Sequence, residues 1–373
     1  MRVLVNGLSI GALSGRHVVY GFLRPLTRWT RGEHEFVLLT HESEPPPEDL
    51  PGANVRHISL SDRLRPWWWR TAWEYRELPK LVRREKIDLV LTASGAVTPT
   101  CGAPQVSLAQ NPWCLVPAAQ YGARQRWKAA LQRRAYRQAL QSAAMMVFIS
   151  RYLESLYGQL KPEGRVARSE IAYVGLDEGT HTAAEAMRAR VEKQRLLIVS
   201  VSAMAPWKGA ETLVTALHKL RRDGVAARLR LVGPWPDSVY RSRIERLIDD
   251  LKLRPDVEIT GQVTKEDLHR HYAEAQVFCL MSCCESFGIP AAEAQAFATP
   301  VVSTRDCAVS EICAGGGRFG PADNPDWTAG ALAELLTNAT AWRECSERGV
   351  ANARALRWDE CARPLMNMFS VVG

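Results

Sequence analysis

The chain has 373 residues and a formal net charge of +8 at pH 7, and this length allows two domains of ordinary size. It contains no run of about 18 apolar residues, which excludes a membrane-spanning helix, and its start lacks a hydrophobic signal region, which predicts a cytoplasmic protein. Nine cysteines without a C-x-x-C pair argue against a disulfide framework and against a zinc site.

The positive charge is concentrated in the first half. Residues 1–172 contain 24 Lys and Arg against 14 Asp and Glu, whereas residues 173–373 contain 24 against 26. This asymmetry predicts that the first half faces an anionic partner, with membrane lipid, a lipid diphosphate and nucleic acid as the candidates.

Apolar runs in the first half predict strands of a parallel sheet at 2–6, 35–40, 87–91, 106–109 and 145–149. A helix is expected from about 16 to 28, after a loop that contains Gly7, Gly11 and Gly15. Glycines in such a loop let a ligand approach the backbone closely at the strand ends. Their spacing is not G-x-G-x-x-G, so NAD binding is not inferred.

The segment from Arg63 to Arg84 interleaves arginines with four tryptophans, at positions 67, 68, 69 and 73. Exposed indole rings gain nothing in water but suit a membrane interface, where guanidinium groups meet lipid phosphate. Alternatively, Trp69 and Trp73 pack into the core as helix neighbours, with the arginines solvated outside. Nucleic acid is a third alternative and is not the expected partner.

A second basic helix is expected at 124–143, with Arg126, Arg133 and Arg137 on a face away from its apolar residues. The stretch from Arg124 to Arg137 therefore supports contact with an anionic membrane surface, although a solvated helix has a similar pattern. A protein with two such segments is expected on the inner face of the cytoplasmic membrane as a peripheral protein.

The second half repeats the alternation of strands and helices after a polar connecting stretch at 177–194. Its apolar runs predict strands at 196–201, 229–232, 257–260, 277–280 and 300–303. Helices are expected at 211–220, after Lys208 and Gly209, and at 291–298. Strands alternating with helices in both halves predict two Rossmann-like domains.

Two carboxylates, Glu285 and Glu293, stand eight positions apart around the turn Gly288-Ile289-Pro290. Pro290 suits the first position of a helix. The backbone N–H groups of Ser286, Phe287 and Gly288 then lie at a helix N-terminus, which attracts anions such as a diphosphate. A nucleotide sugar, with hydroxyls on either side of its phosphates, matches this layout; in isolation, two such glutamates would be a solvated helix cap.

This region resembles the retaining glycosyltransferases of family 4. Their signature is E-x-F-G-x-P, then E-A and a later G-x-P-V-V, and this chain has ESFGIP from Glu285, EA at Glu293 and TPVV from Thr299. Thr299 replaces the glycine of the last motif, and Met281 stands where a proline is common. The resemblance covers about 196–320 with good specificity and the first half more weakly.

The resemblance implies a role for individual residues. It implies that Lys208 neutralises the donor diphosphate, that Glu285 holds a hexose hydroxyl and that Glu293 accepts the ribose hydroxyls. The segment from Ser286 to Ile289 would also bind the donor, Val263 would lie against the base, and Gly15 would lie near the donor phosphates. Ala203 replaces a second cation that is usual in the family.

Asn111 follows the predicted strand at 106–109, at the cleft edge of the expected sheet, where related transferases often place polar residues. It is therefore a candidate contact on the acceptor side. It is equally well explained as a turn former, because Asn-Pro favours turns.

The resemblance also implies the fold class, an α/β GT-B architecture with two Rossmann-like domains facing across a cleft. The acceptor domain is expected at 1–175 and the donor domain at 176–355, with the terminal helix within 356–373 crossing back to the first domain. No cofactor is expected and no metal, because the lysine and the helix N-terminus supply positive charge.

The expected function is hexose transfer, with retention, from a nucleotide-diphosphate sugar to an acceptor. The basic first half favours a lipid-linked saccharide of cell-envelope polysaccharide assembly as that acceptor. A non-catalytic sugar-nucleotide-binding protein and a GT-B epimerase are the alternatives, the first because Ala203 weakens the cationic site.

Overall fold

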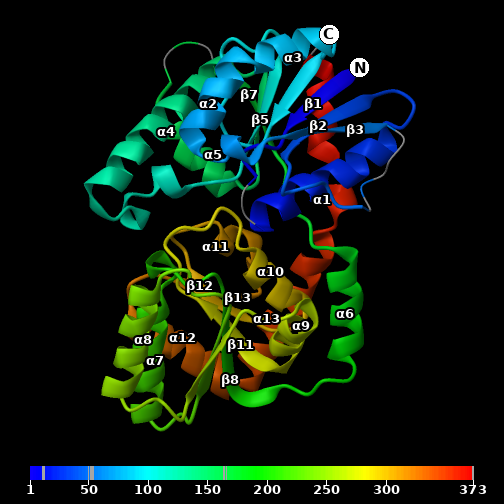
Figure 1. Cartoon of the computed structure of the whole chain (residues 1–373). Coiled ribbons are helices and arrows are strands. Elements are labelled where there is room, and N and C mark those ends of the chain that lie inside the picture. Colours follow the sequence, from blue (N-terminus) through cyan, green and yellow to red (C-terminus); the bar gives the residue numbers. More distant parts are fainter. Residues whose placement is uncertain (11–12, 49, 51–53, 163, 165, 372–373) are drawn as a thin grey trace. The chain divides into compact units, whose positions relative to one another are not determined.

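The computed structural model describes residues 1–10, 13–48, 50, 54–162, 164 and 166–371 (Figure 1). The chain forms two compact units. Unit 1 contains Met1–Leu115, Gln120–Gly175 and Trp358–Gly373, and unit 2 contains Val116–Ala119 and Leu176–Arg357. Apart from Val116–Ala119, the chain leaves unit 1 after Gly175 and returns to it at Trp358.

Unit 1 is built on a parallel sheet of seven strands in the order β3-β2-β1-β4-β5-β6-β7. The strands are β1 (Arg2–Asn6), β2 (Glu35–His41), β3 (Val55–Leu60), β4 (Leu89–Thr92), β5 (Gln105–Ala109), β6 (Met145–Phe148) and β7 (Arg168–Ile171). Strands β4, β5 and β6 are buried along their whole length, because helices cover both faces of the sheet.

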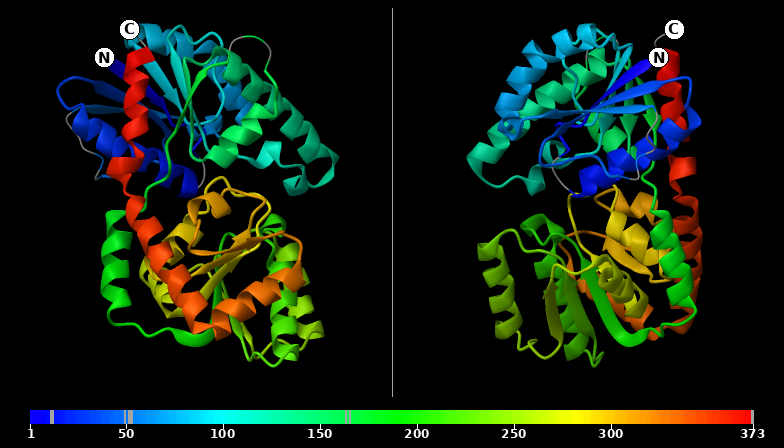
Figure 2. Two further views of the ribbon diagram at one scale, coloured as in Figure 1. Left: turned by 180° about the vertical axis from the view of Figure 1, so that it is seen from behind. Right: turned by 45° about the vertical axis from the view of Figure 1, so that its right-hand side comes forward.

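Helices lie on both faces of this sheet. They are α1 (Leu13–Trp29), α2 (Trp67–Arg76), α3 (Leu78–Arg84), α4 (Gly122–Ser142), α5 (Arg151–Gly158) and α14 (Trp358–Cys361), with 3₁₀ turns η1 (Asp62–Leu64), η2 (Trp113–Leu115) and η5 (Arg363–Val371). Because parallel crossovers are right-handed, α1 covers one face and the helices from α2 to α5 cover the other. Helix α1 shares its face with α14 and η5, which contact it (Figure 2).

The returning C-terminal segment is not the single helix expected within 356–373. It forms the short α14 and then the 3₁₀ helix η5, because Pro364 lacks the N–H donor that a continuous α-helix needs at this point. Trp358 anchors the segment: its indole fills the space above Gly21 and Gly175 and meets the ring of Phe22 edge to face at 5.1 Å.

Among the described residues, exposed large hydrophobic side chains gather on α2 and around the start of α4. Seven of the ten such side chains belong there: Trp67, Trp68, Trp69, Tyr75, Tyr121, Trp127 and Leu131. Trp69 is 52% exposed, so the alternative in which it packs into the core is wrong for this residue, whereas Trp73 is partly buried against the core of unit 1.

Unit 2 is built on a parallel sheet of six strands in the order β10-β9-β8-β11-β12-β13. The strands are β8 (Gln194–Val201), β9 (Arg228–Val232), β10 (Val257–Gly261), β11 (Ala275–Leu280), β12 (Val301–Thr304) and β13 (Gly317–Gly320). The strand order reverses between β8 and β11, and open α/β sheets bind ligands at the carboxyl ends of the strands at such a point.

The helices of unit 2 connect these strands and pack on the sheet. They are α6 (Glu178–Arg188), α7 (Ala210–Arg222), α8 (Ser238–Asp250), α9 (Lys265–Glu274), α10 (Ile289–Ala296), α11 (Val309–Ile312), α12 (Pro325–Thr337) and α13 (Ala339–Ala355), with 3₁₀ turn η4 (Pro206–Lys208); the 3₁₀ turn η3 (Pro117–Ala119) also belongs to this unit. None of the helices in the described part of the chain is long and apolar enough to cross a membrane.

The sequence suggested that the polar stretch at 177–194 connects the two halves as a linker. The structure shows that it forms helix α6 instead. This helix buries Thr180, His181 and Ala184 and contacts α9 and α10. The buried residues are three to four positions apart, a helical spacing that their small or polar side chains conceal in the sequence. The prediction of two Rossmann-like parallel sheets is confirmed.

Candidate active site

Lys208 and Glu285 come together at the carboxyl ends of β8 and β11. Lys208 ends the 3₁₀ turn η4 after β8, and Glu285 lies in the loop between β11 and α10. Lys208 Nζ lies 2.5 Å from Glu285 Oε1, and the two side chains are only 18% and 12% exposed. An ammonium group and a carboxylate that are this little hydrated interact more strongly than a surface pair.

Close backbone contacts hold the two loops in register. The N–H of Cys283 donates to the carbonyl of Trp207 at 3.0 Å. Gly209 has a φ of +72°, and a Cβ on it would lie 2.2 Å from the carbonyl oxygen of Met281. Only glycine fits this position, so the Lys-Gly pair places the ammonium group directly against the loop that carries Glu285.

Helix α10 begins two residues earlier than the predicted range of 291–298, at Ile289, with Gly288 as its N-cap residue. Gly288 has a φ of +89°, and a Cβ there would lie 2.5 Å from the side chain of Val309. Pro290 occupies the first turn, as expected. The half-buried Ser286 and the buried Phe287 precede this helix N-terminus, whose dipole favours an anion.

Glu293 lies on α10, five residues after the N-cap, which corresponds to about 7 Å along a helix axis. Its Oε2 accepts a hydrogen bond from the hydroxyl of Tyr272 at 3.0 Å. Burial raises the pKa of the Glu293 carboxyl to about 7, while Tyr272 and Lys265 lower it. The side chain is nevertheless partly exposed, so it combines a poorly hydrated position with access for a ligand.

Sequence reasoning missed Tyr272 and Lys193, which support this helix. Lys193 Nζ donates to the carbonyl of Phe297 at 2.9 Å and to that of Tyr272 at 3.2 Å. One lysine thus holds the last turns of α9 and α10 together, and burial lowers its pKa to about 7. The only signal in the sequence is a lysine three residues before the predicted buried strand at 196–201.

Ala298, and not Thr299, occupies the position where the family motif has glycine. Ala298 has a φ of +58°, in the left-handed region that favours glycine. Thr299 instead donates from its hydroxyl to the carbonyl of Tyr272 at 2.7 Å, and it accepts from Lys193. The assignment of the replaced glycine to Thr299 is therefore wrong.

Val263 follows β10 and precedes the N-cap residue of α9, Thr264, and it is partly exposed. In unit 1, Gly15 lies in the first turn of α1 and not in the preceding loop, because the helix begins at Leu13. Gly11, from the same predicted loop, lies outside the described residues.

Asn111 is exposed, and its Oδ1 accepts from the backbone N–H of Trp113 at 3.0 Å. This is the local contact of a turn-forming asparagine, as one of the two interpretations predicts. At the position of the usual second cation, Ala203 is exposed on the loop after β8. Among the described residues, no group of three His, Cys, Asp or Glu side chains is placed to hold a metal ion.

Comparisons with known proteins identify the family of the chain. The family profile described as "Glycosyl transferases group 1" matches residues 183–354, and the profile described as "Glycosyltransferase Family 4" matches residues 18–174. A GDP-mannose-dependent alpha-(1-6)-phosphatidylinositol monomannoside mannosyltransferase of Mycobacterium tuberculosis is 30% identical over 244 residues, which is 59% of this chain. The match spans 60% of that relative's own length.

Solved structures establish the fold. The sucrose-phosphate synthase of Thermosynechococcus elongatus superimposes with a TM-score of 0.75 at 18% identity, over 99% of this chain and 98% of that chain. WaaG, a glycosyltransferase involved in lipopolysaccharide biosynthesis, superimposes with a TM-score of 0.72 at 17% identity, over 100% of both chains. The GT-B fold class is confirmed, and the two family profiles show that the chain belongs to glycosyltransferase family 4.

Proposed function

We propose that this protein transfers a hexose, with retention of configuration, from a nucleotide-diphosphate sugar to an acceptor. The observation that carries the proposal is the ion pair between Lys208 and Glu285, largely shielded from water next to the N-terminus of α10. A cation and a helix N-terminus together suit a diphosphate. The M. tuberculosis relative is named for its use of GDP-mannose.

In this proposal the donor binds to unit 2 along α10. Lys208 exchanges part of its pairing with Glu285 for the diphosphate, which frees a Glu285 oxygen for a hexose hydroxyl. The phosphates lie at the backbone from Ser286 to Ile289. Glu293, one turn further, accepts the ribose hydroxyls, and the backbone at Val263 faces the base.

The transfer then breaks the bond between the anomeric carbon and the phosphate oxygen, and it forms a bond from that carbon to the acceptor oxygen on the same face. The proton of the acceptor hydroxyl passes to the departing phosphate oxygen, so no enzyme nucleophile is needed. Lys208 and the N-terminus of α10 stabilise the negative charge that grows on this phosphate. These two groups supply the positive charge that a divalent ion would supply, so we propose a metal-independent reaction.

The proposed acceptor is a lipid-linked saccharide of cell-envelope polysaccharide assembly. Supporting this, the exposed aromatic side chains of unit 1 lie on α2 and near the start of α4, and α4 carries basic residues without an acidic one. We propose that these helices contact an anionic membrane surface from the cytoplasmic side. All nine cysteines are free, which suits a reducing compartment.

A second candidate function is non-catalytic binding of a sugar nucleotide. The observation in its favour is Ala203, which leaves the loop after β8 with Lys208 as its cation. A site with less positive charge still binds a nucleotide through α10 but stabilises a departing phosphate less.

The decisive experiment combines purified protein with a panel of UDP- and GDP-hexoses and a lipid extract, and it measures released nucleotide. The proposal predicts release with one donor and strong loss in Glu285→Ala. If donors bind but wild type and Glu285→Ala release equally negligible nucleotide with every acceptor, the non-catalytic function is correct. Product analysis by NMR then gives the anomeric configuration, and an inverted product would exclude retention.

A further inference from the structure

The carboxyl ends of β1 and β4 form the switch point of the sheet in unit 1, because the strand order runs in opposite directions from there. Open α/β sheets bind ligands outside the strands at such a point. Two buried polar residues end these strands, Asn6 on β1 and its register partner Thr92 on β4. Buried polar groups at strand ends favour a polar ligand over an apolar one.

Helix α2 brings a carboxylate to Asn6. The amide Nδ2 of Asn6 donates to Glu74 Oε1 at 2.9 Å, and its Oδ1 accepts from the N–H of Leu8 at 3.2 Å. Asn6 is thereby fixed between the end of its own strand and α2. Glu74 remains partly exposed although it lies among protein atoms, and a carboxylate bonded to one amide keeps acceptor capacity for hydroxyl groups.

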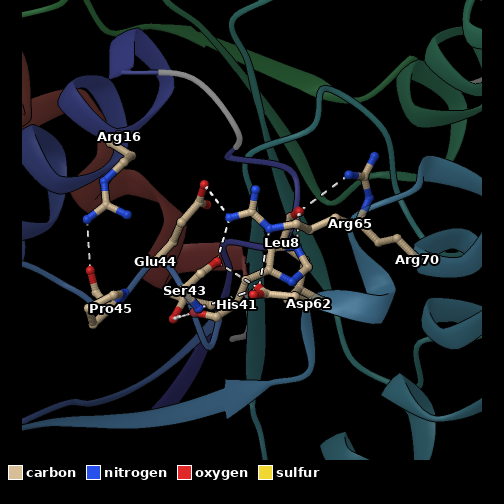
Figure 3. Close-up of polar contacts among 10 residues, drawn as sticks. Leu8, Arg16, His41, Ser43, Glu44, Pro45, Asp62, Arg65 and Arg70 are labelled. Atoms are coloured by element: carbon tan, nitrogen blue, oxygen red, sulfur yellow. Dashed lines mark hydrogen bonds and ion pairs between the residues drawn. The ribbon is translucent and has the colours of Figure 1, made fainter.

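Arg70 lies one helical turn before Glu74, and its Nη1 donates to the carbonyl of Leu8 at 3.3 Å (Figure 3). The nearby Arg65, in contrast, forms ion pairs with Glu44 and Asp62. None of the ion pairs found among the described residues involves Arg70. The guanidinium therefore retains N–H donors in the fork geometry that matches a phosphate.

We propose that Arg70, Glu74 and Asn6 form the acceptor subsite, and that the acceptor is a phosphorylated polyol or sugar. Arg70 binds the phosphate, while Glu74 and Asn6 bind hydroxyls of the ring that carries it. The proposal deepens the proposed function and rests on it. Backbone positions four residues apart on a helix are separated by about 6 Å, which a phosphate and the hydroxyls of its ring can span.

The order of side chains along α2 also suggests how the acceptor is oriented along this helix. The exposed Trp67, Trp68 and Trp69 precede Arg70, and Glu74 follows it. An apolar surface, a cation and a carboxylate thus succeed one another along one helix. This order matches a lipid tail, a phosphate and a polyol ring, and a free phosphorylated polyol would use only the second and third positions.

Titration calorimetry with the full chain tests the subsite. The soluble probes are myo-inositol 1-phosphate, glucose 6-phosphate, unphosphorylated myo-inositol and inorganic phosphate; the lipid probe is phosphatidylcholine vesicles with or without phosphatidylinositol. Arg70→Gln should weaken binding of every phosphorylated probe by about 10- to 100-fold, the loss expected for a charge-assisted contact. Glu74→Gln should weaken the phosphorylated polyols but not inorganic phosphate.

The matched control is Arg31→Gln, which removes the same charge from an exposed position of unit 1. Binding of the soluble polyol phosphates supports a free acceptor, and binding only to phosphatidylinositol vesicles supports a lipid-bound one. Equal losses in Arg70→Gln and Arg31→Gln, or binding of no phosphorylated probe, overturn the proposal. UDP and GDP are titrated in parallel, because failure of wild type to bind either nucleotide refutes the proposed function instead.

Discussion

Lys208 and Glu285 neutralise each other in the structure, so a donor diphosphate has to compete with a carboxylate for the ammonium group. The carboxylate thus occupies the ammonium group of a lysine that is only 18% exposed until the substrate arrives. Substitution of either side chain also affects the other one, because it leaves an unpaired charge beside the helix N-terminus.

We therefore expect Lys208→Ala to lower kcat/KM for nucleotide release by about 10²- to 10³-fold, the usual loss for one group that stabilises transition-state charge. The matched control is Lys219→Ala, which removes a partly buried lysine of the same unit that pairs with the exposed Asp326. Steady-state kinetics with the donor from the panel measure both. A loss in Lys208→Ala no greater than in the control would contradict the assigned role.

Glu293 makes a second prediction at the residue scale, because its folded-state pKa of about 7 lies above the ordinary value of 4.5. A raised carboxyl pKa contributes stability below pH 4.5, and this contribution is lost as the pH rises through 7. Replacing the carboxyl by an amide removes the cost of ionising a buried group. Glu293→Gln should therefore raise Tm more at about pH 8 than at about pH 6.

Donor affinity should show the opposite trend in wild type, rising through pH 7 as the carboxylate that accepts the ribose hydroxyls forms. Thermal unfolding and nucleotide titration at several pH values measure the two trends. Glu266→Gln, at an exposed position on α9, is the control. A pH-independent difference in Tm between wild type and Glu293→Gln would show that Glu293 does not titrate in this range.

The motif at 285–302 predicted that Glu285 precedes the start of a helix and that Glu293 lies on it, because fixed spacing around a turn is a local property. It could not predict Tyr272 or Lys193, since their contacts depend on how α9, α10 and β8 pack together. The misplaced glycine has a similar cause: only backbone geometry shows that Ala298 has the left-handed conformation.

At the scale of elements, most strands predicted from apolar runs are buried, and the partly exposed edge strand β10 was also predicted, at 257–260. Strand β3 was missed because it lies at the edge of the sheet and alternates exposed and partly buried residues without an apolar run. Helix α6 was missed because its buried face consists of small and polar residues. Tertiary contacts stabilise β3 and α6, and these contacts cannot be recognised from the local sequence.

The contact between α1 and α14 gives a prediction at this scale. A Cβ on Gly21 would lie 2.0 Å from Cζ2 of Trp358, so Gly21→Ala must displace the indole that anchors the C-terminal segment. Overpacking of this kind costs about 1–3 kcal/mol, and Tm should fall by about 2–4 °C for each kcal/mol.

The control for this substitution is Gly179→Ala on α6, where nothing lies within 4 Å of the added Cβ. Alanine in an open helical position stabilises by about 0.5–1 kcal/mol, so the two variants should shift Tm in opposite directions. Calorimetric unfolding measures both shifts. If Gly21→Ala is as stable as wild type, Trp358 does not fix the segment to α1.

At the scale of the whole molecule, positive charge and exposed aromatic surface occur in the same half of the chain. Residues 1–172 carry the entire surplus of Lys and Arg, and unit 1 contains the exposed aromatic side chains of α2 and the start of α4. From Tyr121 to Lys128, every residue is exposed, although the ammonium group of Lys128 lies 5.7 Å from the centre of the Trp113 ring. An anionic membrane surface satisfies both features at once.

We therefore expect wild type to float with anionic vesicles at low salt and less at high salt, since salt screens the charges. Replacing Trp68 and Trp127, which are 52% and 61% exposed, by serine should weaken vesicle binding by about tenfold, because indole burial supplies part of the affinity. Arg124→Gln with Arg126→Gln should weaken it too, and only at low salt. Val239→Ser, at an exposed apolar position of unit 2, is the control and should leave flotation unchanged. Failure of wild type to float at low salt would exclude membrane contact through α2 and α4.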